Sequence, residues 1–290
     1  MRDAVNLGRE LGPDRISAMD QSGVDVQVVS YSTPSQLGPA ETAAALTSAA
    51  NDRLAAAVEA SAGRLAAFAA LPWQTPAEAA DELTRCVESL GMTGALLMGR
   101  PGATFLDDPR YEPVLERFSA LGVPLYLHPY YPVLDVQRAY YDGFSPSVSA
   151  TFSLGGWGWH HEAGIHVLRM ILSGVFERHR GLQVISGHWG EMVPFYLSRL
   201  DTAMPQSMTG LSAPISDIYR QHVWVTPSGL LDQAQFEFIF RTVGPDRIIW
   251  SADYPYLTMD GNRSFLDDLR IPEEDKRKIT HENAESLLRL

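Results

Sequence analysis

The chain has 290 residues, of which 45% are apolar, so it is long enough to bury one large core. Asp and Glu number 35 and Lys and Arg 23, which gives a net charge of −12. Such a chain lacks the basic surface that nucleic-acid and anionic-membrane binders need. Its apolar runs are also shorter than the roughly 18 residues of a membrane-spanning helix, and its first residues contain no apolar signal core.

Cys86 is the single cysteine, which excludes an intramolecular disulfide and a cysteine-rich zinc site. It lies in the middle of a helical pattern, where we expect a small buried apolar group. Together these features predict a soluble, cytoplasmic globular protein of one domain over residues 1–290. It is expected to bind neither nucleic acid nor membranes.

Short apolar runs alternate with helical patterns along the chain. In chain order, the predicted elements are a helix from Pro13 to just before Gly23, strands at 26–32 and 65–71, a helix that starts at Pro76 behind a Thr75–Glu78 capping box, a strand at 93–98, a helix between Pro109 and Gly122, and strands at 124–128, 182–187, 223–226 and 247–251. Continuous apolar runs are typical of strands that are buried on both faces, as in a parallel sheet.

The number of strands favours one architecture. A (β/α)8 barrel needs eight strands to close, whereas seven runs are found and the chain starts with a helix, so the first βα element is expected to be absent. An open, doubly wound sheet is the alternative, but it would need a glycine-rich turn after the first strand, and residues 31–34 (YSTP) are not one. We therefore predict a (β/α)8 TIM barrel that lacks its first strand in this chain.

Polar residues follow three of the predicted strands at equivalent points. His128 ends the strand at 124–128, His188 and Glu191 follow the strand at 182–187, and Asp253 follows the strand at 247–251. The active site of a barrel lies at these carboxyl ends. Imidazole and carboxylate groups suit a divalent metal or a proton-transfer site. The alternative is that each caps a helix or completes a local hydrogen bond, and Glu191 could do this while it also orients His188.

The remaining histidines divide into three groups. His160 and His161 adjoin the start of a helix and could reach the pocket. His166 is assigned to an apolar stripe with Ile165, Leu168, Arg169 and Leu172, as a packed core histidine. The others are expected to be solvated, at the surface or at a cap: His179, His222 and His281.

The segment after His128 is rich in aromatic residues. From residue 130 to residue 159, eight of thirty residues are Phe, Trp or Tyr, or about 27% against 10% for the whole chain. A long connection at the carboxyl end of a barrel strand predicts a lid at about 130–160, and it would suit a flat apolar substrate. Tyr130 and Trp157 are candidate substrate contacts, although a subunit interface would also collect such residues. Arg100 follows another strand and could pair with a substrate carboxylate, or be a solvated loop residue.

The motifs LHP at 127–129, GHWGE at 187–191 and SADYP at 251–255 resemble the amidohydrolase-2 branch of the amidohydrolase superfamily. Residues 64–72, 194–201 and 283–288 fit the same pattern, so the resemblance covers almost the whole chain. It is greatest to the metal-dependent decarboxylases of 2,3-dihydroxybenzoate and γ-resorcylate, with the aminocarboxymuconate-semialdehyde decarboxylases as relatives.

The resemblance implies a barrel that holds one divalent ion, zinc or manganese, with His128 and Asp253 as ligands. It implies that His188, supported by Glu191, is the catalytic histidine and that Asp253 is the proton donor. The substrate would be a small aromatic, ortho-hydroxylated carboxylate that loses CO2, which makes the enzyme a carbon–carbon lyase. Arg100, Tyr130, Trp157 and His161 are the candidate substrate-binding residues, and a homodimer or homotetramer is expected.

The sequence departs from the family pattern in one respect. The family's first strand carries a Glu-x-His or His-x-His pair of metal ligands, and no strand of this sequence has one. We expect either residues upstream of this chain or a divergent member that binds metal weakly. Metal-assisted hydrolysis or hydration, and a degenerate metal-free barrel, are the alternatives to decarboxylation.

Overall fold

Six short strands of the computed structural model run parallel, and each pairs with strands that are its neighbours in the sequence. The strands are β1 (Gln27–Val29), β2 (Leu65–Ala67), β3 (Ala95–Met98), β4 (Leu125–His128), β5 (Val184–Ser186) and β6 (Val223–Val225). A bridge between Ala69 and Ala95 joins the β1–β2 pair to the β3–β6 sheet. The structure describes residues 2–290, with side chains from residue 6 onward.

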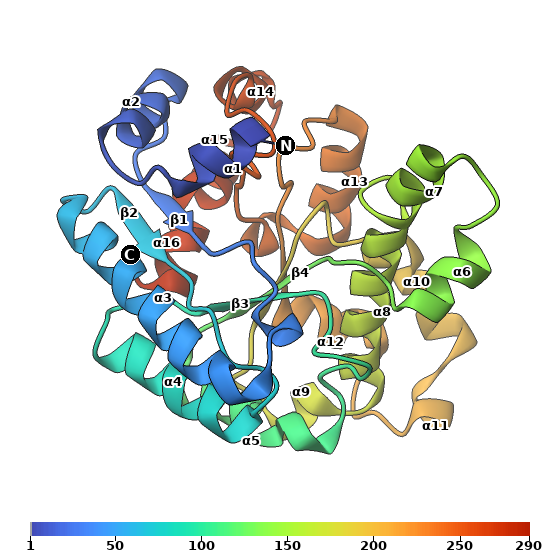
Figure 1. Cartoon of the computed structure of the whole chain (residues 1–290). Helices are drawn as coiled ribbons and strands as arrows, with labels where there is room; N and C mark the ends of the chain where they lie inside the picture. Colours follow the sequence, from blue (N-terminus) through green and yellow to red (C-terminus); the bar gives the residue numbers. More distant parts are fainter. Residues whose placement is uncertain (1) are drawn as a thin grey trace.

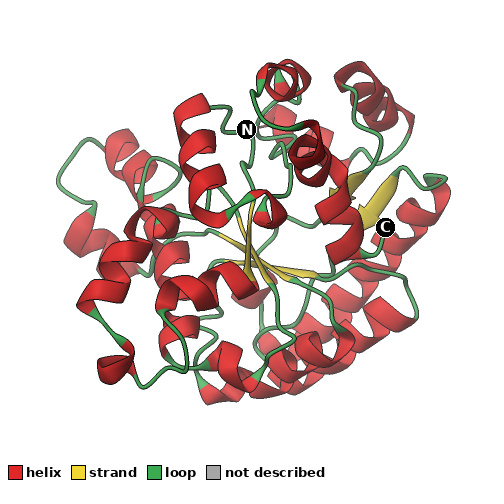
Figure 2. Ribbon diagram, turned by 180° about the vertical axis from the view of Figure 1, so that it is seen from behind, coloured by secondary structure: helices red, strands yellow, loops and turns green. Residues whose placement is uncertain are grey.

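The helices surround these strands, as Figures 1 and 2 show. Their bounds are α1 (Arg2–Arg9), α2 (Pro13–Ser22), α3 (Ala40–Ala60), α4 (Pro76–Glu88), α5 (Glu112–Leu121), α6 (Leu134–Tyr140), α7 (Pro146–Ser153), α8 (Gly158–Leu172), α9 (Val175–Arg178), α10 (Val193–Ala203), α11 (Gln206–Thr209), α12 (Ile215–His222), α13 (Gln233–Val243), α14 (Asn262–Asp268), α15 (Glu273–Arg277) and α16 (Asn283–Leu288). Parallel strands inside a layer of helices are the arrangement of a (β/α) barrel, so the predicted fold class is confirmed. Within residues 2–290, no helix is both long and apolar enough to cross a bilayer.

The predicted helix boundaries agree with the structure at several glycines. Gly23 and Gly122 adopt left-handed conformations with φ of 68° and 63° at the ends of α2 and α5. Glycine adopts this conformation without the steric cost that a Cβ atom brings. The predicted capping box is not formed: the Thr75 hydroxyl donates to the Glu78 side chain (2.7 Å) and accepts no backbone N–H of α4, and the Thr75 N–H donates to the Pro72 carbonyl.

The seventh predicted strand is reduced to one bridge. Val225 pairs with Ile248, and the Ile249 N–H donates to the Val225 carbonyl at 3.0 Å. The next N–H, of Trp250, instead donates to the Ile279 carbonyl at 3.1 Å. The segment therefore leaves the sheet after one residue pair, because the chain near Ile279 takes over its hydrogen bonds.

Side chains rather than strand pairing link the two ends of the described sheet. No ladder among residues 2–290 joins β1 to the segment at 248–251. Across this gap, the Tyr256 hydroxyl donates to Ser32 at 2.8 Å, and the Arg15 guanidinium lies 5.0 Å from the Tyr254 ring centroid. The first βα element that the sequence analysis expects to be absent would fit in this gap.

One apolar core fills the space between the strands and the helices. It includes fully buried side chains from β3, β4 and β5 together with Trp73 and Phe118, whose rings stack at 6.4 Å. Burying a side chain of this size removes about 1.5–3 kcal/mol of unfavourable hydration. The core holds the strands in place, and their carboxyl ends carry the polar residues described next.

Candidate active site

His128 is the last residue of β4, where it pairs with Met98 of β3. Its Nδ1 lies 2.7 Å from the Pro129 carbonyl oxygen. A carbonyl can only accept, so Nδ1 carries the hydrogen and Nε2 keeps its lone pair. Burial lowers the pKa of His128 to about 4. A neutral ring with a free Nε2 is the form of histidine that binds metals.

The loop that follows β5 has an unusual backbone. Five consecutive residues from His188 to Met192 have positive φ values of 44°, 59°, 83°, 52° and 67°. Such conformations cost of order 1–3 kcal/mol each for non-glycine residues and collect at functional sites. At Gly190, a Cβ atom would lie 2.6 Å from the Tyr219 hydroxyl, so only glycine fits there.

Hydrogen bonds from the segment that follows β6 hold this loop in place. The Trp189 N–H donates to the Thr226 carbonyl at 2.9 Å, and the His188 N–H donates to the Ser228 hydroxyl at 3.2 Å. The Trp189 indole N–H also donates to the Leu230 carbonyl at 2.8 Å. These contacts fix the direction in which the side chain of His188 leaves the backbone.

Glu191 lies at the centre of the site and its side chain is fully buried. One carboxylate oxygen lies 2.6 Å from Nδ1 of His188, and the other lies 2.7 Å from Nδ1 of His160. Burial alone would raise the pKa of Glu191, but the two imidazoles outweigh it and the pKa is lowered. For His188, burial opposes protonation, but the Glu191 carboxylate outweighs it and the pKa is raised.

Asp253 follows the bridge at Ile248 and lies near the same histidines. Its backbone also has a positive φ, of 58°. Burial raises its pKa to about 6, against the opposing effect of His188 and His160. A carboxyl group with a pKa near neutrality can hold and release a proton.

A layer of hydroxyl groups lies below these residues in the barrel. The Tyr126 hydroxyl is 3.1 Å from that of Thr226 and 3.2 Å from that of Ser228. Burial raises the pKa of Tyr126 to about 12, so its hydroxyl stays protonated. The layer links β4 to β6 and supports the loop that carries His188.

The structure brings His128, His188, Glu191 and Asp253 to the same end of the barrel, as predicted. The rings of His128 and His188 have centroids 6.0 Å apart. Glu191 does not cap α10, because the N-cap residue of that helix is Met192 and no side chain caps it. Their roles in metal binding and catalysis stay predictions.

The four candidate substrate-binding residues are placed differently from one another. Arg100 lies 2.8 Å from the Glu162 carboxylate through its Nε, in a largely buried ion pair. Tyr130 packs edge to face on Tyr131 at 5.1 Å. The other two, Trp157 and His161, are exposed, and Trp157 is 47% exposed. Their contact with substrate stays a prediction.

His160, which the sequence named with His161 as able to reach the pocket, contacts the site, and so does Trp159, which the sequence counted only within the aromatic segment. The Trp159 ring packs edge to face on His128 at 6.1 Å, and its indole N–H donates to Nε2 of His160 at 2.9 Å. For His160, the helical pattern of the sequence gives a partial signal. His160, Ala163 and Val167 share one face of α8 at spacings of three and four residues, and Ala163 and Val167 are buried.

Among the other histidines, two predictions are confirmed and two are wrong. His166 is a core residue, as predicted, and its Nε2 accepts the Leu106 N–H at 3.0 Å. Its buried neighbours on α8 are Val167, Met170 and Ile171 rather than the predicted stripe. Two histidines expected at the surface are buried: His179, which is 2.5 Å from Glu112, and His222, which is 2.9 Å from the Leu182 carbonyl. His281 is exposed and Cys86 is buried, as expected.

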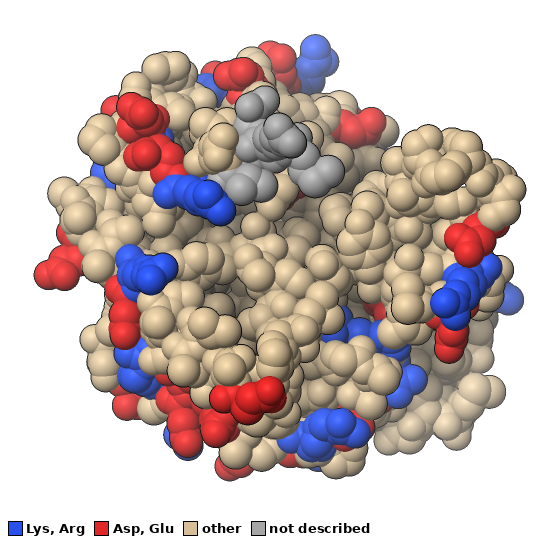
Figure 3. Space-filling model, in the orientation of Figure 1, with Lys and Arg blue, Asp and Glu red and all other residues tan. Residues whose placement is uncertain are grey.

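The aromatic segment at 130–160 forms α6 and α7 before it reaches α8. Tyr141 is buried and packs edge to face on Phe152 at 5.0 Å. The surface over α7 carries no charged side chain (Figure 3). The exposed apolar residues of this segment are Tyr131, Leu134, Tyr140, Phe144, Val148 and Trp157.

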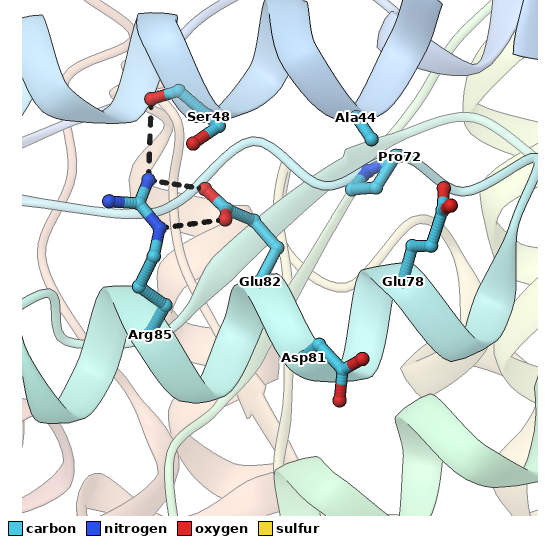
Figure 4. Close-up of a pocket in the computed structure, with 7 residues that line it drawn as sticks. All are labelled: Ala44, Ser48, Pro72, Glu78, Asp81, Glu82 and Arg85. Carbon is cyan, nitrogen blue, oxygen red and sulfur yellow. Dashed lines mark hydrogen bonds and ion pairs between the residues drawn. The ribbon is translucent and has the colours of Figure 1, made fainter. Parts of the chain in front are cut away.

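A pocket on the outer wall of the barrel is separate from this site. It lies between α3 and α4, and the residues that line it include Ser48, Glu78, Glu82 and Arg85 (Figure 4). Glu82 is paired with Arg85 at 2.8 Å, and Glu78 accepts a hydrogen bond from Thr75 at 2.7 Å. Since Glu78 and Glu82 already have partners and none of the candidate site residues lines this pocket, we do not place the active site there.

Comparisons with known proteins agree with this arrangement. A family model described as Amidohydrolase matches residues 8–290. The decarboxylase OrsB of Emericella nidulans is 32% identical over 97% of this chain and 86% of its own length. The gamma-resorcylate decarboxylase of a Polaromonas species is 33% identical over 95% of this chain and 86% of its own length.

A solved structure extends the likeness to three dimensions. The dihydroxybenzoic acid decarboxylase from Polaromonas, with bound manganese and the inhibitor 2-nitroresorcinol, superposes with a TM-score of 0.89. It is 31% identical, and the match covers 97% of this chain and 86% of that one.

Proposed function

The chain belongs to the amidohydrolase family, and from this premise we propose that it is a metal-dependent, non-oxidative decarboxylase of a small aromatic acid with an ortho-hydroxyl group. The observation that carries the proposal is the meeting of His128, His188 with Glu191, and Asp253 at one end of the barrel. The named relatives, which decarboxylate aromatic acids, support the reaction type.

One divalent ion, manganese or zinc, is the proposed cofactor. His128 presents a neutral ring with a free Nε2, and Asp253 presents a carboxylate. Both groups are common ligands of such ions. A bound ion supplies positive charge that attracts the carboxylate and the ortho-hydroxyl oxygen of the substrate. Two protein ligands are fewer than the three of most catalytic sites, so the substrate's two oxygens would complete the donor set.

The protein groups then move two protons. Nε2 of His188 accepts the hydrogen of the ortho-hydroxyl, because its Nδ1 hydrogen is held by Glu191. This increases the electron density on the ring carbon that bears the carboxylate. Asp253, whose pKa of about 6 lets it hold a proton, donates that proton to the carbon, and a C–H bond forms. The bond between the ring and the carboxylate breaks, its electron pair restores the aromatic ring, and CO2 leaves. His188 then returns its proton to the phenolate oxygen, and Asp253 regains a proton from water.

The aromatic segment at 130–160 is proposed to cover the pocket and to join subunits in a homodimer or homotetramer. Its exposed residues include Tyr140, Phe144 and Trp157, and aromatic residues are enriched in protein interfaces. Light scattering on the wild type and on Phe144→Asp tests this. The charge should shift the protein towards monomers, and an unchanged mass for the variant would contradict it.

An assay with 2,6-dihydroxybenzoate tests the proposed reaction. We expect release of CO2 and formation of resorcinol. In D2O, the product should carry one deuterium at the carbon that lost the carboxylate. If a panel of ortho-hydroxylated benzoates releases no CO2 while a lactone or an ester is hydrolysed, the proposal is wrong and the hydrolase alternative holds.

A further inference from the structure

The Glu191 carboxylate is shared by two imidazoles that come from different parts of the chain. His188 belongs to the loop after β5, and His160 belongs to the first turn of α8. Each binds a different oxygen, at 2.6 Å and 2.7 Å. The rings of His160 and His188 also meet edge to face, with centroids 4.6 Å apart.

The hydrogen of His160 that points to Glu191 is fixed from the other side of the ring. The Trp159 indole can only donate, and it donates to Nε2 of His160 at 2.9 Å. In the neutral ring the hydrogen is therefore on Nδ1, where it faces the carboxylate. The Gly155 carbonyl lies 3.1 Å from the same Nε2 and would accept its hydrogen if the ring were doubly protonated. In both forms Nδ1 remains a donor to Glu191.

A carboxylate with a single partner would be less well fixed. The terminal torsion of Glu is broad, so the group rotates unless both of its oxygens are held. A buried oxygen without a donor also carries a desolvation penalty. His160 removes both problems, because its bond to one oxygen leaves the other aligned with Nδ1 of His188.

We infer that His160 is a positioning residue, which holds Glu191 so that the hydrogen of His188 stays on Nδ1 and the lone pair on Nε2 faces the pocket. The inference rests on the proposed function for its effect on rate, but not for its effect on the ring of His188. The ligand atoms of His160, His188 and Glu191 are also close enough to hold a metal ion. Their mutual hydrogen bonds already account for this closeness.

Two substitutions separate the hydrogen bond from the bulk of the ring. His160→Asn places an amide N–H near the position of Nδ1, so it keeps a donor to Glu191. His160→Leu fills similar space without a donor. We expect kcat of His160→Leu to fall about 10- to 100-fold, as for other supporting residues of a site, with KM changed by less than about threefold. Asn should restore kcat to within about threefold of the wild type.

The tautomer of His188 gives a readout that does not depend on catalysis. The nitrogen chemical shifts of the labelled imidazoles distinguish a hydrogen on Nδ1 from a hydrogen on Nε2. We expect His188 to carry it on Nδ1 in the wild type and in His160→Asn, and to become a mixture in His160→Leu. His281→Asn and His281→Leu, on an exposed histidine, are the matched controls. If His160→Leu does not fold, His160→Ala with added free imidazole replaces it, and the imidazole should restore the Nδ1 form.

The outcomes separate the two proposals. If the wild type releases no CO2 but the tautomer of His188 changes in His160→Leu, decarboxylation fails and the positioning role stands. If the wild type is active and His160→Leu keeps both its kcat and the Nδ1 form of His188, the positioning role is overturned. It is also overturned if Leu and Asn reduce kcat equally while the tautomer stays the same.

Discussion

His128 and His188 meet edge to face, with ring centroids 6.0 Å apart and ring planes inclined by 71°. They follow different strands, and each has its Nδ1 bound to an oxygen atom, of Pro129 and Glu191 respectively. Both rings therefore turn Nε2 away from their supports. This shared orientation is the basis of the first two predictions.

Replacing His188 by Asn should lower kcat/KM for decarboxylation by at least about 100-fold. A positioned general acid or base typically contributes 10²–10⁴ in rate. Steady-state kinetics with 2,6-dihydroxybenzoate measure the effect, and His281→Asn is the control. A loss of less than about tenfold, on the order of 1.4 kcal/mol of barrier, would remove His188 from the mechanism.

Removal of divalent metal should abolish activity. Dialysis against EDTA should leave less than a few per cent of the rate, and added Mn²⁺ should restore it, because His128 and Asp253 would again hold the ion. Elemental analysis should find about one ion per chain, and fewer in His128→Ala. Full activity of a chelated, metal-free sample would contradict the proposed cofactor.

Because the ring of His166 is buried, the free energy of unfolding should decrease as the pH is lowered. Burial lowers its pKa to about 3, below the ordinary 6.5. Between these values the unfolded chain binds a proton that the folded chain excludes, so the free energy of unfolding decreases as pH falls from 6.5 towards 3. The slope from this group is at most about 1.4 kcal/mol per pH unit. Urea unfolding between pH 7 and pH 4.5 measures it.

His166→Gln is the comparison for this pH effect. The Gln carbonyl can still accept the Leu106 N–H that Nε2 accepts at 3.0 Å, but it does not titrate. Its advantage over the wild type should therefore grow as the pH falls. His281→Gln should follow the wild type, and parallel curves for His166→Gln and the wild type would refute the prediction.

Breaking the pair of Arg100 and Glu162 should destabilise the fold. Both side chains are largely buried, with 12% and 7% exposure. Removing one partner leaves the other charge buried, which costs about 3–5 kcal/mol. Arg100→Met and Glu162→Leu should each show this loss in denaturant unfolding, and the double variant that combines them should lose less than the sum.

The exposed pair of Arg263 and Asp267 is the control for this prediction. Its side chains are 71% and 60% exposed, and such pairs contribute at most about 1 kcal/mol. If Arg100→Met costs no more than Arg263→Met, the buried pair is not important for stability. A rise in KM without a loss of stability would instead support the predicted contact of Arg100 with substrate.

The sequence predicts the strands well because each buried strand is a continuous apolar run. It predicts His128 and Asp253 because barrel strands place their last residues at one end. His179 and His222 were misassigned because their burial depends on contacts with Glu112 and Leu182, which lie far away in the sequence. Adjacent helix residues point about 100° apart, so choosing between His160 and His161 requires knowing which face of α8 is buried.

The positive φ values of residues 188–192 limit the use of this His-x-x-Glu motif in other proteins. On an ordinary helix, residues three apart are held by right-handed geometry, whereas here the pair forms across a backbone of opposite hand. Placing the same four residues on a helix would not reproduce the 2.6 Å contact between Nδ1 of His188 and the Glu191 carboxylate. A transplant would have to carry Gly190 together with Thr226 and Ser228, which follow β6 and hold the loop, so the transferable unit is the loop with its neighbouring strand end rather than a tetrapeptide.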